Sequence, residues 1–167
     1  MTIKTVEVEH QAGAHFAATT GSGFEVHFDS GAGQTAAGPT EVMLAALAAC
    51  SAMDVVSILE KKRQPFSRYQ VHVSAEQRDG YPQVFTRIDL VHELEGPELE
   101  LAAVRRCIEL SATKYCPVSA MLSAGAPCRR PVPIDIADAS RPALTGAPGH
   151  SPVAASKPNR NQDGSPS

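Results

Sequence analysis

The chain has 167 residues and a formal net charge of −3 at neutral pH. Hydrophobic residues make up 43% of it and charged residues 20%, which suits one globular domain of ordinary size with a tail. Tryptophan is absent, other aromatic residues are few and the net charge is acidic, which excludes the basic, stacking surface typical of nucleic-acid-binding proteins. The first ten residues have no secretory-signal pattern. We therefore expect a cytoplasmic protein without a nucleic-acid partner.

Cysteines and histidines are spread along the chain without the spacing of a metal site. The cysteines are Cys50, Cys107, Cys116 and Cys128, and they form no C-x-x-C pair or close Cys/His cluster. His10, His15 and His27 fall in predicted strands and are expected to face solvent. The sequence predicts no metal and, in a reducing compartment, free thiols rather than a disulfide framework.

Three short stretches near the N-terminus are predicted as strands: the first and third alternate between apolar and polar residues, as half-buried strands do, and the second can pair between them. They are Ile3–His10, His15–Thr20 and Phe24–Phe28. Gly13 and the cluster Gly21–Gly23 supply turns between them. The sequence predicts an antiparallel meander here.

The stretch Pro39–Leu59 is the most apolar part of the chain, and its many Ala, Leu and Met residues favour a helix. Proline suits the first position of a helix, and Glu41 in the first turn complements the positive helix end. Because this helix is apolar on nearly all sides, we expect it to be buried at the centre of the fold. At about 100° per residue, Cys50 shares one face with six residues. They are Met43, Ala46, Leu47, Met53, Asp54 and Ser57.

A run of roughly 18 apolar residues is also long enough to cross a bilayer. Asp54 near the end of the run, the many alanines and the amphipathic strands elsewhere favour a core helix instead. We therefore predict no membrane partner.

Two further alternating stretches, Tyr69–Glu76 and Val84–Glu95, flank a turn at Asp79–Pro82 and predict a long hairpin with one polar face. Glu98–Thr113 has the pattern of an amphipathic helix. Cys107 lies on the apolar stripe of this helix and is interpreted as a packing residue.

A short helix is predicted to begin at Pro117 and to end by Gly125, which places Cys116 at its N-cap. Backbone N–H groups and the positive end of a helix stabilise a thiolate, and Lys114 is near in sequence. We therefore predict that Cys116 is more acidic than a thiol in apolar surroundings.

After this helix, Arg129–Ile136 is predicted as an edge strand, because its prolines discourage further pairing. From Ala137 onward the composition changes to Ala, Ser, Pro, Gly and Asn, with too few large apolar residues to fold. The predicted organisation is one domain over residues 1–136 and a disordered tail over residues 137–167.

The two cysteine segments resemble the OsmC/Ohr family of osmotically inducible and organic hydroperoxide resistance proteins. The resemblance rests on GPTEVMLAALAACSAMDVVSIL around Cys50, on KYCPVSAML around Cys116 and on the strand order between them. It covers about residues 3–136, and CSAMDVVSILEKKRQ is most similar to the OsmC-like branch of the family.

The resemblance implies an α+β OsmC-like fold in which antiparallel sheets wrap a buried central helix and two chains intertwine as a homodimer. It also implies that the Cys50 thiolate attacks the O–O bond of a small organic hydroperoxide and becomes a sulfenic acid, which Cys116 resolves as a disulfide. An external thiol or lipoyl reductant then restores the thiols, and no metal, flavin or other cofactor is required. The implied function is an antioxidant peroxidase of the oxidative stress response.

The sequence departs from the family pattern at the residues that support the attacking cysteine. The family's peroxidases pair a glutamate before the central helix with an arginine from the N-terminal strands. Here no arginine precedes Arg63, and Thr40 occupies the position of that glutamate, with Glu41 directly after it. Glu41 and Asp54 are the candidate supporting residues, although an ionised Asp54 one turn from Cys50 would raise the pKa of that thiol.

The candidate substrate pocket is the apolar surface beside Met43, Leu47 and Met53, which suits the carbon chain of an alkyl hydroperoxide. The alternative function is a non-peroxidatic OsmC-like protein that uses the same pocket to bind a small apolar or thiol-reactive ligand. Disulfide formation with hydroperoxide distinguishes the two, because a binding protein would only shield its thiols from alkylation.

Overall fold

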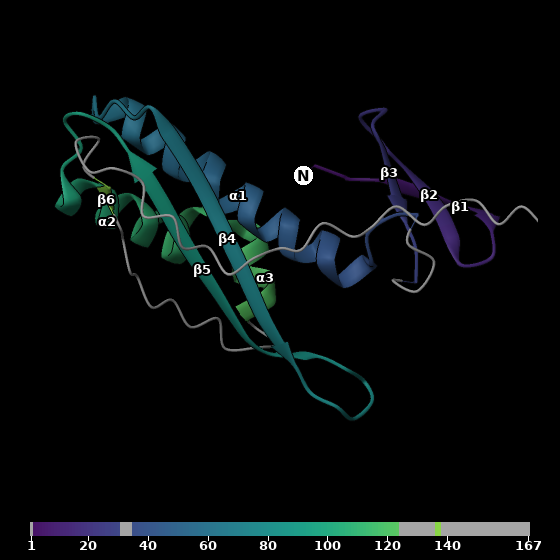
Figure 1. The fold of residues 1–167 in the computed structure, drawn as a ribbon. Coiled ribbons are helices and arrows are strands. Elements are labelled where there is room, and N and C mark those ends of the chain that lie inside the picture. Colours follow the sequence, from purple (N-terminus) through teal and green to yellow (C-terminus); the bar gives the residue numbers. More distant parts are fainter. Residues whose placement is uncertain (1, 31–34, 124–135, 138–167) are drawn as a thin grey trace, which may run out of the picture.

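The computed structural model describes residues 2–30, 35–123 and 136–137 of the chain. These residues form an α+β fold with two separate sheets (Figure 1). In chain order the elements are β1 (Val6–Ala12), β2 (His15–Thr20), β3 (Glu25–Phe28), α1 (Pro39–Lys61), β4 (Arg68–Gln77), β5 (Phe85–Glu95), α2 (Leu101–Leu110), η1 (Ser111–Tyr115), α3 (Pro117–Ser123) and β6 (Ile136–Ala137). The expected order of strands and helices is confirmed, except that η1 was not predicted.

The first sheet is the predicted antiparallel meander of β1, β2 and β3. Its register pairs Val8 with Ala18 and Ala18 with Val26, so apolar residues share one face, whereas Glu9 and His27 lie on the opposite face. Figure 1 shows this sheet beyond the N-terminal end of α1, apart from the second sheet and the other helices. Within one chain, therefore, the first sheet does not wrap the central helix.

α1 begins as predicted, with Pro39 in its first turn and the Gly38 N–H donating to Oε2 of Glu41 at 2.7 Å. Its buried residues form a single stripe with a spacing of four positions. They are Leu47, Ser51, Val55 and Leu59. Only 22% of its most apolar 18-residue window is buried. The elements of this chain cover one side of α1 only, so burial of its other sides, which we expect from a partner chain, stays a prediction.

Among the described residues, α1 is the one helix long and apolar enough to cross a membrane. These two criteria are weak evidence, since core helices of globular proteins also meet them. The buried stripe of α1 packs against β5 and α2, as in a core helix. This packing favours the core-helix interpretation over a membrane span.

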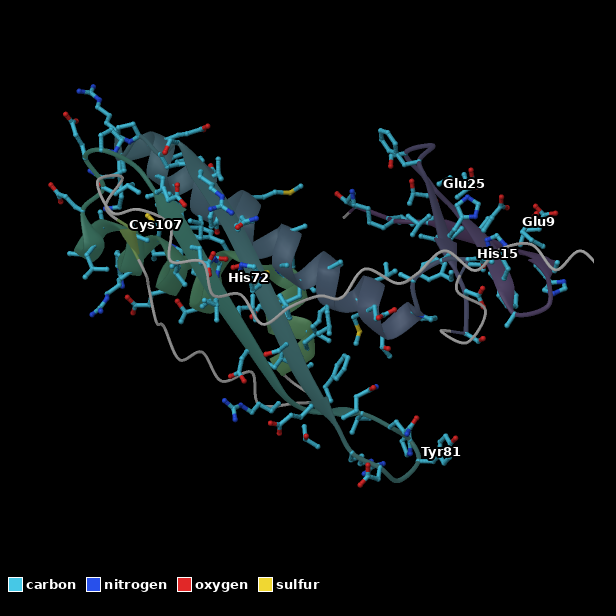
Figure 2. The ribbon with its side chains drawn as sticks, viewed as in Figure 1. Glu9, His15, Glu25, His72, Tyr81 and Cys107 are labelled. Atoms are coloured by element: carbon cyan, nitrogen blue, oxygen red, sulfur yellow. The ribbon has the colours of Figure 1, made fainter. Side chains whose placement is uncertain are left out.

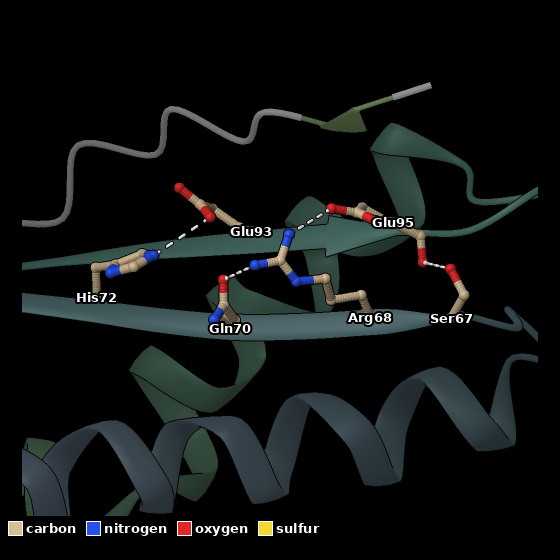
Figure 3. A network of polar contacts seen from close by, with 6 residues as sticks. All are labelled: Ser67, Arg68, Gln70, His72, Glu93 and Glu95. Atoms are coloured by element: carbon tan, nitrogen blue, oxygen red, sulfur yellow. Dashed lines mark hydrogen bonds and ion pairs between the residues drawn. The ribbon is translucent and has the colours of Figure 1, made fainter. Parts of the chain in front are cut away.

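The second sheet is built on the predicted long antiparallel hairpin of β4 and β5. The outer face of the hairpin is polar (Figure 3): Nη1 of Arg68 lies 2.9 Å from Oε1 of Glu95, and Nε2 of His72 lies 3.3 Å from Oε2 of Glu93. The inner face of β5 carries buried residues that pack toward the helices. They are Phe85, Ile88, Leu90, His92 and Leu94. The predicted division into one polar and one buried face is confirmed.

Two core clusters join this hairpin to the helices. The first contains Val55, Leu59, Leu94, Val104, Cys107 and Ile108, from α1, β5 and α2. The second contains Leu47, Phe85, Ile88, Leu90 and Cys116, from α1, β5 and the residue before α3. Cys107 is fully buried in the first cluster, which confirms its interpretation as a packing residue.

The helix predicted over Glu98–Thr113 is divided in the structure. α2 ends at Leu110, and the backbone then widens into the π-helical turn η1 before α3 begins at Pro117, as predicted. The predicted strand Arg129–Ile136, the tail over residues 137–167 and Cys128 lie almost wholly outside the described residues. The short strand β6, which is described, pairs in parallel with the end of β5.

Candidate functional site

Cys50 and Cys116 lie side by side, although one is on α1 and the other directly precedes α3. Their sulfur atoms and a carboxylate oxygen of Asp54 all lie within 4.8 Å of one another. Cys50 and Asp54 are half-buried, whereas Cys116 is 3% exposed. The structure thus brings together three of the residues selected from the sequence, and the group opens to solvent on the side of α1.

The π-helical turn η1 holds Cys116 in place. The Cys116 N–H donates to the Ser111 carbonyl at 2.9 Å, and the Cys116 carbonyl accepts from the Ala120 N–H at 3.1 Å. The Ser119 N–H donates to the sulfur of Cys116 at 3.3 Å. Cys116 therefore occupies the N-cap of α3, as predicted, and its thiol takes the place of the usual capping oxygen.

A chain of buried hydroxyl groups holds Asp54. The Ser111 hydroxyl donates to Oδ2 of Asp54 at 3.0 Å, and the Ser51 hydroxyl lies 3.2 Å from the Ser111 hydroxyl. Both serines are fully buried. Sequence reasoning missed them, and the available signal was a serine directly after Cys50 within an apolar helix.

Burial dominates the electrostatics of Cys116. Loss of water contact raises the pKa of its thiol to about 11, helped by a hydrogen bond with Cys50 and by the negative charges of Cys50 and Asp54. The Ser119 N–H opposes this rise, but its effect is smaller. The Lys114 ammonium lies over the Tyr115 ring, 5.3 Å from its centre. The prediction of an acidic Cys116 is therefore wrong, because desolvation outweighs the helix end.

The other candidate site residues lie in surroundings that differ from those of the two cysteines and Asp54. The Glu41 carboxylate caps α1 at Gly38, and nine residues of helix, about 13.5 Å, separate its backbone from that of Cys50. Leu47 is fully buried in the second core cluster, with Met43 packed against that cluster, whereas Met53 is 72% exposed. Met43 also lines the cavity described next, whereas Leu47 and Met53 do not.

A cavity of about 310 Å³ opens between the N-terminal half of α1, the hairpin and α3. Its apolar lining residues include Met43, Val84, Phe85, Ile88, Met121 and Leu122. Phe85 and Ile88 also belong to the core cluster that contains Cys116. The cavity therefore shares two of its lining residues with the core cluster that contains Cys116.

Cys107 and the histidine pair of the first sheet lie away from this site. Figure 2 shows Cys107 within the helical part of the molecule, whereas His15 lies on the first sheet. Burial raises the pKa of Cys107. Nε2 of His15 lies 3.1 Å from Nδ1 of His27, and Nε2 of His27 lies 3.6 Å from Oε2 of Glu25. These imidazoles bond to each other on the polar face of the sheet.

The fold and the site together define the class of this protein. It is an α+β protein with two neighbouring thiols between an apolar helix and an antiparallel hairpin. Residues 31–129 match the family model described as OsmC-like protein. The chain belongs to this family.

Similar proteins come from several bacteria. Protein YhfA of Escherichia coli K12 is 42% identical over 110 residues, which span 66% of this chain and 82% of YhfA. A crystal structure of a hypothetical protein from Aquifex aeolicus has a TM-score of 0.73 and 27% identity, over 83% of this chain and 100% of that chain. An organic hydroperoxide resistance protein OsmC from Legionella pneumophila has a TM-score of 0.59 and 14% identity, over 79% and 97% of the two chains. The last similarity concerns the fold alone.

Proposed function

We propose that this protein is a cysteine-based thiol peroxidase that reduces organic hydroperoxides. The observation that carries the proposal is the separation of at most 4.8 Å between the sulfur atoms of Cys50 and Cys116. A disulfide needs an S–S bond of about 2.05 Å, so rotation of these side chains brings the sulfurs together without refolding. Membership of a family that includes organic hydroperoxide resistance proteins supports the same chemistry.

The proposed reaction has two steps. The Cys50 thiolate attacks one peroxide oxygen, the O–O bond breaks, and the other oxygen leaves as the alcohol after taking a proton; Cys50 becomes a sulfenic acid. The Cys116 sulfur then attacks the Cys50 sulfur, and the sulfenic hydroxyl leaves as water with the Cys116 proton. An external dithiol or lipoyl reductant reduces the resulting disulfide. We assign attack to Cys50 because it is the more exposed of the two thiols.

Glu41 and Asp54 have different proposed contributions. Glu41 stabilises the start of α1 through Gly38, which fixes the helix that carries Cys50. Burial is the main cause of the raised pKa of Cys116, and Asp54 adds a smaller effect in the same direction, which helps to keep this thiol protonated until Cys50 has reacted. We further propose that the protein acts in the cytoplasm as a homodimer.

The test uses reduced full-length protein, an alkyl hydroperoxide and a dithiol or lipoyl reductant. Wild type is expected to consume peroxide and to form one intramolecular disulfide, observed by mass spectrometry. Cys50→Ser should abolish consumption, and Cys116→Ser should accumulate a sulfenic acid that dimedone traps. Cys107→Ser is the matched control and should retain activity, because Cys107 lies in the other core cluster. Rapid consumption by Cys50→Ser would reverse the assignment.

The apolar cavity of about 310 Å³ favours a second candidate function, the binding of a small apolar or thiol-reactive ligand. In that case wild type would consume no hydroperoxide with any dithiol. A bound ligand would instead slow alkylation of Cys50 without forming a disulfide. The substitution Met43→Ala would then weaken ligand binding, because Met43 lines the cavity.

A further inference from the structure

We propose that the reduced site binds a thiophilic metal ion of the Zn²⁺ type through Cys50, Asp54 and Cys116. This goes beyond the proposed peroxidase, because it assigns a ligand to the thiols in the absence of peroxide. The geometry carries it: two sulfur atoms and one carboxylate oxygen lie within 4.8 Å of one another, which is the size of a metal's coordination shell.

The spacing of the three atoms is close to that of a tetrahedral site. Zinc binds sulfur at about 2.3 Å and carboxylate oxygen at about 2.0–2.2 Å, so two zinc-bound sulfurs lie roughly 3.8 Å apart. The observed upper limit of 4.8 Å exceeds this by about 1 Å, which rotation of a half-buried side chain provides. Cys50 and Asp54 are one turn apart on the same face of α1, the helical spacing that many metal sites use.

Asp54 and Cys116 already have hydrogen-bond partners that orient them. The Ser111 hydroxyl donates to Oδ2 of Asp54, and the Ser119 N–H donates to the sulfur of Cys116. Hydrogen bonds of this kind fix the ligands of metal sites and strengthen binding. Three protein ligands, with Cys50 and Asp54 half-buried, leave a fourth position for water or a small ligand.

The ligand types select the metal. Thiolate ligands favour Zn²⁺ or Cu⁺ over Mg²⁺ and Ca²⁺, which prefer oxygen. On binding, each thiol releases its proton to solvent, and the dication offsets two of the three negative charges on the two sulfurs and the carboxylate. The imidazole pair of His15 and His27 on the first sheet is the competing site among the described residues, and the test includes it.

The test adds Co²⁺ or Zn²⁺ to untagged, reduced full-length protein under anaerobic conditions, without peroxide. Co²⁺ should bind once per chain and give the near-ultraviolet charge-transfer bands of thiolate ligation. Zn²⁺ should be retained against a chromophoric chelator. Cys50→Ser and Cys116→Ser should lose this binding, and Asp54→Asn should weaken it about tenfold or more, since even the loss of a ligand-orienting residue costs about 10–100-fold. Cys107→Ser and His27→Asn are the matched controls and should bind as wild type does.

X-ray absorption of the zinc-loaded wild type provides a measurement that does not depend on how variants fold. It should show two sulfur neighbours together with oxygen. A first shell of nitrogen and oxygen, unchanged binding in Cys50→Ser, or loss of binding in His27→Asn would overturn the proposal, as would an Asp54→Asn protein that binds Zn²⁺ as tightly as wild type. Because no peroxide is present, each of these results is independent of the proposed peroxidase.

Discussion

At the scale of single residues, Cys116 is subject to two opposing effects. The Ser119 N–H at the start of α3 favours its thiolate, whereas burial and the neighbouring Cys50 and Asp54 favour its thiol. Burial has the largest effect, so the pKa rises to about 11. The sequence indicated the cap correctly, but it could not show how little water reaches the sulfur. That depends on the core cluster around Cys116, whose other members come from α1 and β5.

The raised pKa of Cys116 predicts how the second step of the proposed reaction depends on pH. Below about pH 11 the thiol dominates, and the thiolate that attacks the sulfenic acid increases about tenfold for each pH unit. The lifetime of the Cys50 sulfenic acid should therefore shorten about a hundredfold between pH 8 and pH 10, whereas a thiol with an ordinary pKa of about 8.5 would level off in this range. Dimedone trapping in rapid-quench experiments measures this lifetime, with Cys116→Ser as the control that should lack the trend. A wild-type lifetime that does not change with pH would contradict the prediction.

At the scale of secondary structure elements, the buried stripe of α1 ties the two core clusters together. Leu47 belongs to the cluster around Cys116, and Val55 and Leu59 belong to the cluster around Cys107. Ser51, between them, carries the hydroxyl chain to Ser111. The stripe therefore positions Cys50 as well as stabilising the fold.

Leu59→Ala should lower the free energy of unfolding by about 2–5 kcal/mol, because it leaves a cavity in a fully buried cluster. Glu60→Ala on the exposed end of the same helix is the control and should change stability by less than about 0.5 kcal/mol. Urea unfolding at one fixed protein concentration measures both. Equal losses in the two variants would show that the stripe is not the main contact of α1.

The strands and α1 could be predicted because their signals are local: alternation of apolar and polar residues, and a Gly-Pro start with Glu41 as cap. The division of the predicted helix Glu98–Thr113 could not, since no local pattern marks a π-helical turn. Ser111 begins that turn and bonds to Ser51 and Asp54, which lie 60 and 57 residues away in the chain. Such turns often occur at functional sites. Contacts between residues so far apart in the sequence form only in the folded protein. The hydrogen-bonded hydroxyl groups of Ser51 and Ser111 could therefore not be predicted.

At the scale of the whole molecule, β1 and α1 each expose apolar side chains within the described part of the chain. On β1, Val6 is 58% exposed and Val8 62%, and both lie on the apolar face of the first sheet. On α1, the outward side exposes Met53 by 72%. Exposed apolar surface of this extent marks an interaction site. A second copy of the chain, whose first sheet covers the outward side of α1, would bury both surfaces through one symmetric contact.

We therefore expect a homodimer in which each first sheet packs on the partner. Sedimentation at micromolar concentration should show a dimer, and the midpoint of unfolding should rise with protein concentration, because association stabilises only the folded state. Val8→Asp places a charge on the apolar face and should dissociate the dimer or lower its stability. Glu9→Ala, on the polar face of the same strand, is the matched control and should remain dimeric. A wild type that sediments as a folded monomer, with an unfolding midpoint independent of concentration, would contradict this assembly.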